Sequence, residues 1–334
     1  MEEEVMCSGF FRAVEADTIS CLDSFQASGW LQFFFGNLLE AFYNIGFTIL
    51  NPQLWLAWLP FINAPMDDVA VKESLMRFIY YGGSVELFFA VFVIFLIVTI
   101  VGLVNNRFMW GCVRGLERFA NIVGRTAAWA ALLMVLQQIM IIFMQRVFAV
   151  SEIGVGFGVN FAKDVSWWSE ELKFYNAIIV CLCASYTFVQ GGHVRVDLVY
   201  SAIGYRAKRV IDMVGSMVLM VPAAIVTWLY GWFFLWRHLV VPNPSASDSL
   251  DRLITRARAL RWNIETIGFS PNGFNAYFLF KILLLTFTAM ILLQAVAFLY
   301  RSYLEWKEGP ESEGRNLDKD KIGDETAELV AEIH

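Results

Sequence analysis

The segment from Leu87 to Leu103, LFFAVFVIFLIVTIVGL, constrains the fold more than any other part of the chain. It carries no charge and no alternation of polar and apolar residues. A bilayer core about 30 Å thick needs roughly 20 predominantly apolar residues in a helix that crosses it. Strands of a membrane barrel would instead alternate, and only helices and closed barrels satisfy their backbone groups in lipid. The sequence therefore predicts an all-α integral membrane protein.

The composition of the whole chain agrees with this fold class. Hydrophobic residues make up 58% of the chain and charged residues only 17%, which soluble domains rarely reach. The formal net charge of -6 comes largely from the first four residues and from the segment after Lys307, so it carries no information about partners. Nothing in the charge distribution indicates a nucleic-acid partner. Because the start lacks basic residues and the first apolar stretch begins near Trp30, we expect uncleaved anchoring helices rather than a cleaved signal peptide.

Six apolar stretches predict a bundle of about six transmembrane helices. They are Gly29 to about Leu50, Val85 to Val104, about Thr126 to Phe148, about Phe174 to Val189, Tyr205 to about Leu239, and Asn275 to Leu299. In the first stretch Asn37, Glu40 and Asn44 recur at helical spacing and form a polar stripe. Five spans with this first helix lying in the interface therefore remain an alternative to six.

These stretches divide the chain into three predicted parts. Residues 1–112 form an N-terminal extension with one spanning helix and one spanning or interfacial helix. Residues 113–306 form a four-helix membrane domain, and residues 307–334 form a charged tail that we expect to be disordered.

The distribution of Lys and Arg predicts the orientation of the spans, because short cytoplasmic loops carry an excess of both. The connector from Asn105 to Arg125 and the loop from Gly191 to Val210 are basic and should be cytoplasmic. Alternation then places Ser151 to Lys173 and Val241 to Gly273 outside and the C-terminal tail inside. The N-terminus, with little charge to count, is placed inside with six spans.

The loop from Val241 to Gly273 is an exception, because it is external by alternation and yet contains several arginines. An apolar face at helical spacing explains them: we expect an external amphipathic helix at the membrane surface or against a partner. The residues of this face are Leu250, Leu253, Ile254, Ala257 and Leu260.

The cysteines and histidines give little support to a redox, metal or catalytic site. The five cysteines contain no CxxC pair and no neighbouring histidine, so we expect them to pack as small residues rather than form disulfides; they are Cys7, Cys21, Cys112, Cys181 and Cys183. A haem anchor needs two facing imidazoles within the membrane, whereas His193 and His238 should lie at opposite edges and His334 in the tail. We expect no cofactor and no enzyme.

Few ionisable residues fall within or near the spans, although charge in hydrocarbon is usually retained for a reason. Arg146 and Lys281 should lie near the outer interface, and snorkelling to the headgroups is the favoured interpretation for both. An ion pair of Arg146 with Glu170 or Glu171 is the alternative. Gln137 and Gln138 should pack against another helix. Since no internal repeat and no midplane acid is visible, the chain is not expected to translocate substrate by itself.

Two motifs flank the span that begins near Phe174. Trp168-Ser169-Glu170-Glu171-Leu172 precedes it, and GGHVRVDL follows it, with Gly191, Gly192, His193, Arg195 and Asp197. Both resemble the DctQ-type small membrane subunit of tripartite ATP-independent periplasmic (TRAP) transporters. The segment QIMIIFMQRVF, which contains Arg146, is similar to the end of the family's first helix. The resemblance covers roughly Arg114 to Trp306, and the front section up to about Cys112 is additional.

The resemblance implies a bacterial inner-membrane protein that is a small permease subunit. It would brace the large membrane subunit of a sodium-coupled, binding-protein-dependent transporter for organic acids, such as C4-dicarboxylates or related carboxylates. The implied partners are that large subunit and a periplasmic substrate-binding protein, and the long basic helix from Tyr205 would lie near anionic lipid at the cytoplasmic face. Arg146, the WSEE residues and the GGHVRVDL residues would form a subunit or lipid interface.

Three alternatives remain. The chain could be the membrane anchor of a redox or other enzyme complex, or a carrier that needs no partner. GGHVRVDL could also serve folding alone, with glycines that make a turn and Arg195 paired with Asp197.

Overall fold

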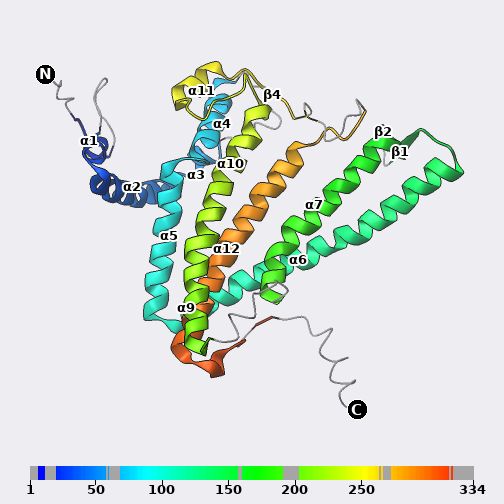
Figure 1. Cartoon of the computed structure of the whole chain (residues 1–334). Helices are drawn as coiled ribbons and strands as arrows, with labels where there is room; N and C mark the ends of the chain where they lie inside the picture. The colour runs from blue at the N-terminus through cyan, green and yellow to red at the C-terminus, as the bar shows by residue number, and fades with distance from the viewer. Residues whose placement is uncertain are drawn as a thin grey trace, which may run out of the picture. The chain divides into compact units, whose positions relative to one another are not determined.

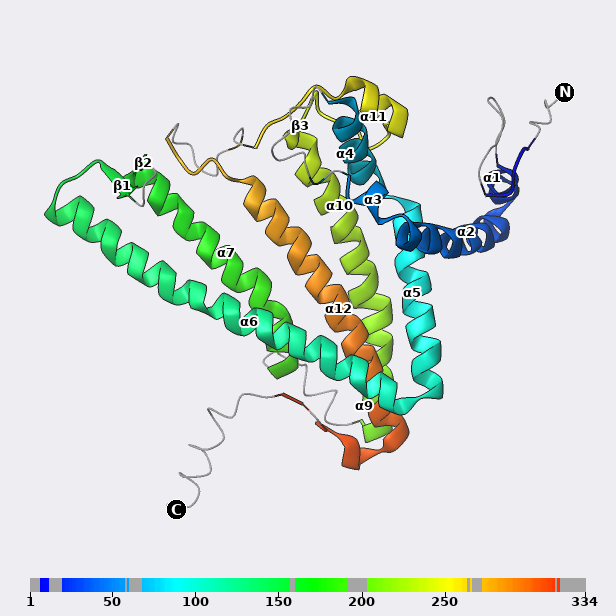
Figure 2. The same cartoon turned by 180° about the vertical axis from the view of Figure 1, so that it is seen from behind.

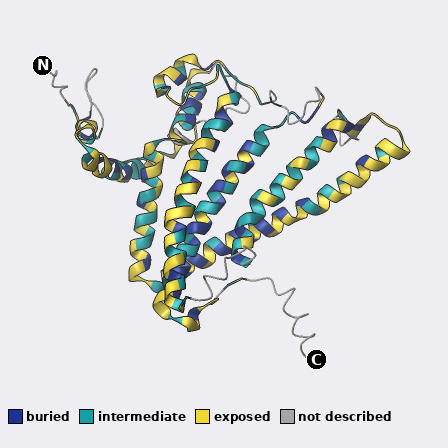
Figure 3. Cartoon of the chain, in the orientation of Figure 1, coloured by how far each residue is buried: buried dark blue, intermediate teal, exposed yellow. Residues whose placement is uncertain are grey.

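The computed structural model describes residues 7–11, 20–57, 59, 68–156, 160–190, 203–262, 265, 272–315 and 317–318. The chain divides into two compact units, one formed by Met1–Val104 and Val240–Leu260 and the other by Asn105–Leu239 and Arg261–His334. Within the described residues, six helices are long and apolar enough to cross a membrane. The predicted all-α membrane fold is therefore confirmed. Figure 1 shows these helices, and no more than 33% of the most apolar window of each one is buried, as expected for helices that face lipid (Figure 3).

The first unit is built around α5, the most hydrophobic of the six candidate spans. Its α2 packs on α5 through Ala41, Phe89 and Val93. The elements of this unit are α1 (Cys21–Ala27), α2 (Trp30–Leu50), α3 (Pro52–Trp55), α4 (Val69–Tyr81), α5 (Val85–Val104), β3 (Val240–Val241), α11 (Leu250–Arg256) and β4 (Ala259–Leu260).

The predicted amphipathic helix is shorter than its apolar pattern. It begins at Leu250 as expected, but α11 ends at Arg256, and Ala257 has extended backbone angles. The chain leaves the helix because Arg258 donates its N–H to the carbonyl of Val241 and β4 pairs with β3. The prediction that Ala257 and Leu260 continue one helical face was therefore wrong.

The second unit consists mainly of long helices. Its α6 and α7 run antiparallel and are joined by a two-stranded β1–β2 ladder that pairs Glu152 with Asp164 (Figure 2). The elements are α6 (Asn106–Ile142), the π-helix η2 (Phe143–Val147), β1 (Glu152–Gly156), β2 (Asn160–Asp164), α7 (Val165–Gln190), α9 (Tyr205–Gly215), the π-helix η3 (Ser216–Met220), α10 (Val221–Leu239), α12 (Phe278–Glu308) and the 3-10 turn η4 (Pro310–Ser312). The predicted long helix from Tyr205 to Leu239 is thus confirmed.

The basic segment between Asn105 and Arg125 is not a loop, as its polar composition had indicated, but the first half of α6. The side chain of Asn105 caps this helix by accepting from the N–H groups of Arg107 and Phe108. The helix and η2 together span 42 residues, far more than the roughly 20 that a bilayer requires. Part of α6 must therefore lie outside the hydrocarbon.

A glycine allows α6 and α7 to approach closely. A Cβ atom on Gly124 would lie 2.2 Å from the Cβ of Tyr186, which real atoms do not tolerate. The backbone carbonyl of Gly124 also lies 3.5 Å from the thiol of Cys183. No other side chain fits at this crossing without moving one of the helices.

Two of the cysteines form a disulfide. Cys7 and Cys21 are bonded, with their Cα atoms 4.9 Å apart, and this corrects the expectation that all five cysteines pack as free residues. Cys112, Cys181 and Cys183 are free and half-buried. The pairing had no sequence signature, because two cysteines fourteen residues apart match no redox or metal motif.

The start of the predicted disordered tail is folded. Residues 310–312 form a 3-10 turn, and Ser312 is buried. Asp318 accepts hydrogen bonds from Asn121 through its backbone carbonyl at 2.8 Å and its carboxylate at 3.1 Å. The described part of the tail therefore packs against α6.

Candidate subunit-interface site

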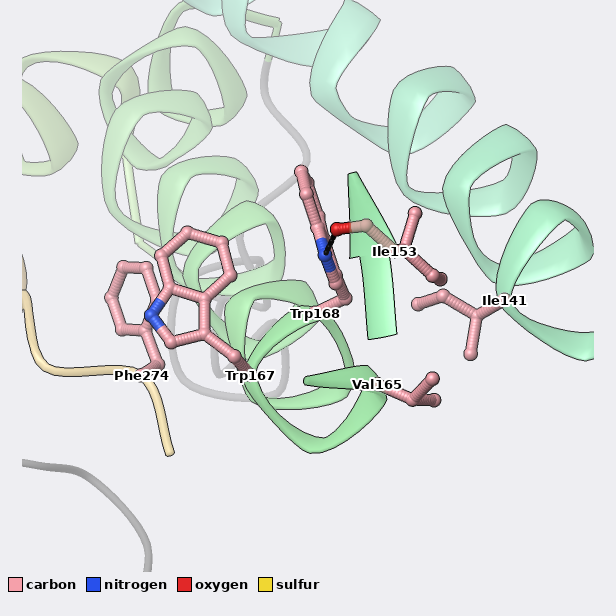
Figure 4. Packing of buried hydrophobic residues seen from close by; sticks show 6 residues of the cluster. All are labelled: Ile141, Ile153, Val165, Trp167, Trp168 and Phe274. Atoms are coloured by element: carbon pink, nitrogen blue, oxygen red, sulfur yellow. Dashed lines mark hydrogen bonds between the residues drawn. The ribbon is translucent and has the colours of Figure 1, made fainter. Parts of the chain in front are cut away.

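The first turn of α7 holds the tryptophan of the WSEE motif inside a small apolar cluster (Figure 4). This cluster consists of Ile141, Ile153, Val165, Trp167, Trp168 and Phe274. The indole of Trp168 donates to the carbonyl of Ile153 at 3.3 Å, and the ring of Trp167 lies 5.0 Å from that of Phe274. Strand β1, helix α7 and the segment that leads into α12 are joined at this point.

The two acids of the motif bind neighbouring segments rather than a cation. Glu170 accepts the backbone N–H of Phe274 at 2.7 Å, which pairs this donor in the segment that leads into α12. Glu171 accepts from the side chain of Gln137 at 3.0 Å, and the same Gln137 donates to the carbonyl of Trp168. Gln137 thus packs against α7 as predicted, whereas Gln138 is exposed.

Arg146 lies in η2 and is exposed, as is Ser169 in the first turn of α7. Between Arg146 and Glu170 or Glu171, all of which the structure describes, there is no ion pair; the two acids accept from the amide donors above instead. The ion-pair alternative for Arg146 was wrong. The side chain of Arg146 is exposed. Ser169 is the other described motif residue that is exposed at the surface of this unit.

The residues of the second motif, Gly191, Gly192, His193, Arg195 and Asp197, lie outside the described residues. Their predicted role stays a prediction.

A second polar site, which sequence reasoning missed, lies where α6, α9 and α12 meet. We call it the ion cluster and define it by Glu117, Arg209, Arg301 and Glu305, each of which is at most 8% exposed. Arg301 donates from Nε to one oxygen of Glu117 at 2.6 Å and from Nη2 to the other at 2.5 Å. This two-pronged geometry is the strong form of an arginine–carboxylate pair.

The ion cluster continues from Arg301 to α9. Glu305 lies one turn after Arg301 on α12, and its second oxygen lies 3.0 Å from Nε of Arg209. Arg209 also pairs with Glu313 at 2.6 Å and with Asp212 at 3.4 Å. Two arginines thus join three helices and the start of the tail.

Burial of Arg209 corrects the prediction that the whole basic turn of this helix faces lipid. Arg206 is exposed and available at the surface, but the guanidinium of Arg209 is turned inward toward Glu305. A charged side chain needs a partner inside a protein, and the acid on α12 provides it.

Lys281 also differs from expectation. It does not snorkel: the residue is 2% exposed, its ammonium lies 2.5 Å from Glu265, and it sits 4.2 Å from the centre of the Phe234 ring. His238 lies 3.2 Å from the other oxygen of Glu265. The lysine is therefore held by an ion pair and by cation–π attraction.

The sequence contains part of the information about the ion cluster. Arg301 and Glu305 are four residues apart on one helical face, as are Tyr205 and Arg209. Glu117 is the single acid in the basic first half of α6. The spacing could have identified each face, but it could not have joined residues 184 positions apart.

The comparison with known families adds the remaining evidence. Residues 158–248 match the sequence model of the family described as "Tripartite ATP-independent periplasmic transporters, DctQ component". The matched region runs from the β1–β2 turn through α7 to the end of α10 and beyond, which is narrower than the resemblance noted above. No curated protein and no solved structure matches the chain.

Members of this family are transporter subunits of the bacterial inner membrane and not enzymes, and the chain has the multi-pass helical structure that this location requires. The front section, which includes α1 to α5, precedes the matched region. Residues 158–248 of this chain thus match the DctQ component of TRAP transporters, the small membrane subunit.

Proposed function

We propose that this subunit braces the large membrane subunit of its transporter, as a fixed wall against which the carrier moves. By the family resemblance, the carrier takes organic acids such as C4-dicarboxylates or related carboxylates, is driven by sodium, and receives its substrate from a periplasmic binding protein. The family matched by residues 158–248 works with a large membrane subunit and a periplasmic binding protein, and these are the partners we propose.

The ion cluster is the observation that carries this proposal. A brace must resist deformation, and four buried charges connect α6, α9 and α12 across the second unit. Removal of one partner from a buried ion pair typically costs about 3–5 kcal/mol, because the other charge is left unpaired. Helices joined in this way do not slide past one another easily.

The first half of α6 supports a cytoplasmic contact with anionic lipid. Arg107, Arg114, Arg118 and Arg125 are exposed and recur at spacings of seven, four and seven residues, so they lie on one face of the helix. The same turns direct Glu117 and Asn121 inward. A helix with a row of exposed arginines on one face and buried contacts on an adjacent face is suited to the surface of the cytoplasmic leaflet.

The motif residues divide between two roles in this proposal. Trp168, Glu170 and Glu171 are occupied inside the unit and position the α6–α7 hairpin. Arg146 and Ser169 are exposed at the same end and would contact the partner subunit or lipid headgroups. For Gly191, Gly192, His193, Arg195 and Asp197, a role at an interface rests on the family resemblance.

A mild-detergent pull-down of the tagged chain from its native membrane tests the proposal. We expect a large multi-helix permease to co-purify with the wild-type chain. An Arg301→Met variant, which breaks the ion cluster, should recover much less of it. The control Arg258→Met, which changes an exposed arginine outside the ion cluster and outside the arginine face of α6, should recover the normal amount. Recovery of the chain alone, with uptake of solute by liposomes that contain nothing else, would contradict the bracing role.

A further inference from the structure

Helix α2 has three distinct faces, and together they fix how it lies in the membrane. The first face packs on α5, the second is covered by α1, and the third is apolar and exposed. All of these elements belong to the first unit.

The first face shows that α2 crosses α5 instead of running beside it. Phe33, Phe34 and Ala41 all pack against α5, and they extend over about 12 Å of α2 at 1.5 Å per residue. Their partners on α5 are Phe89, Phe92 and Val93, which extend over about 6 Å of that helix. A helix that spanned the membrane next to α5 would contact it along a much longer stretch. Figures 1 and 2 show the same crosswise arrangement.

The second face carries the polar stripe. Glu40 accepts a hydrogen bond from Gln26 of α1 at 2.9 Å, and Gly36 lies against the same glutamine. Asn37 is buried beside them and donates to the carbonyl of Phe33. In Figure 1, α1 lies on the side of α2 opposite to the direction in which α5 extends. The polar groups of α2 therefore face away from the hydrocarbon.

The third face is an exposed apolar stripe at helical spacing. It consists of Leu31, Phe35, Leu39, Phe42 and Ile49, with exposures of 47%, 53%, 51%, 52% and 72%. These positions lie on the side of the helix opposite to Gly36 and Glu40 at 100° per residue. Since α1 covers the polar side, the stripe is directed along α5, toward the hydrocarbon that α5 crosses.

The disulfide identifies the side of the membrane. Cys7 and Cys21 join the start of α1 to the segment before it, and stable disulfides form in oxidising compartments such as the bacterial periplasm and not in the cytosol. The basic first half of α6 follows directly after Val104, which places the end of α5 in the cytoplasm and its start at Val85 outside. Both observations place α1 and α2 at the outer surface.

We propose that α2 lies in the extracytoplasmic interface of the membrane. Its apolar stripe is inserted between the outer-leaflet acyl chains, and the disulfide-linked α1 covers the polar face of α2 on the periplasmic side. The N-terminus is then extracytoplasmic, and the chain crosses the membrane five times. This inference does not depend on the proposed bracing role, because it uses only residues of the extension and the sequence that follows it.

The depth of the stripe is the sharpest test. Nitroxide labels are placed singly at Leu31→Cys, Leu39→Cys and Ile49→Cys in full-length protein that lacks Cys112, Cys181 and Cys183, in lipid nanodiscs. Accessibility to oxygen and to a water-soluble nickel complex then gives each label's depth. We expect similar, shallow depths at all three positions. In a spanning helix, Leu31 and Ile49 would differ in position along the membrane normal by about 27 Å, with Leu39 near the centre, and that result would overturn the proposal.

The sidedness of the disulfide provides a second test that requires no new residue in α1. Spheroplasts that carry the same three cysteine replacements are treated with a membrane-impermeant phosphine reductant and then with a PEG-maleimide. We expect a gel shift of two PEG chains after reduction and none without it. A Glu311→Cys control in the C-terminal segment, with Cys7 and Cys21 also replaced, should react only after permeabilisation. Cysteines that react without reductant, and only in permeabilised cells, would place the N-terminus in the cytoplasm and contradict the proposal.

Discussion

The guanidinium of Arg301 donates from Nε and Nη2 to both carboxylate oxygens of Glu117, across a sequence separation of 184 residues. Both residues are buried, and the second acid in contact with Arg301, Glu305, is buried as well. This pair holds the first half of α6 to the end of α12. Its removal should therefore affect the whole second unit.

Arg301→Met should lower the free energy of unfolding by about 3–5 kcal/mol, because Glu117 is left buried without a partner. Thermal unfolding in detergent, followed by size-exclusion chromatography, measures the effect. The double variant Arg301→Met with Glu117→Leu should recover part of the loss, since no unpaired charge remains at position 117. A single variant as stable as the wild type would show that the pair contributes nothing.

Gly124→Ala should weaken the contact between α6 and α7, because the new Cβ would lie 2.2 Å from the Cβ of Tyr186. A loss of about 1–3 kcal/mol is expected from the forced helix displacement. Gly115→Ala is the matched control, since nothing lies within 4 Å of its added Cβ and alanine favours the helix. Equal thermal stability of the two variants would argue against the close crossing.

Glu170→Ala should leave the N–H of Phe274 without its acceptor and destabilise the entrance to α12 by about 1–3 kcal/mol. Hydrogen exchange of the Phe274 amide should become faster, as read by mass spectrometry of the peptide that contains it. Ser169→Ala changes the adjacent, exposed motif residue and should leave this exchange unaltered. Unchanged exchange in Glu170→Ala would contradict the assigned hydrogen bond.

The double variant Arg114→Gln with Arg118→Gln should retain less anionic lipid, at about 1 kcal/mol per arginine removed from the membrane surface. Native mass spectrometry of protein released from nanodiscs with phosphatidylglycerol reports the bound lipid. Arg252→Gln with Arg256→Gln removes the same charge from α11 and should have a smaller effect. If both double variants lose lipid equally, the arginine face of α6 is not a preferred lipid site.

The sequence was sufficient to predict the helices that can cross the membrane, because their length and apolar composition follow from the thickness of the bilayer. Leu87 to Leu103 and the long helix from Tyr205 to Leu239 were identified on that basis. The basic connector was misjudged because polar composition does not distinguish a loop from a helix with one arginine face.

The side-chain partners of buried charges and of the cysteines could not be predicted from a single sequence. Whether Lys281 snorkels or binds Glu265 depends on which segment lies opposite to it, and local spacing contains no such information. The same is true of the disulfide between Cys7 and Cys21 and of Arg301 with Glu117. The orientation of α2 likewise became clear only when its contacts with α5 and α1 were known.

Reconstituted uptake tests the central claim most directly. Proteoliposomes would contain the large subunit that co-purifies with this chain. The chain would be present, absent, or replaced by Arg301→Met, with binding protein, labelled organic acid and a sodium gradient supplied. We expect sodium-dependent uptake only with the wild-type chain, and a marked loss with Arg301→Met. Full uptake by the large subunit without this chain would contradict the bracing role.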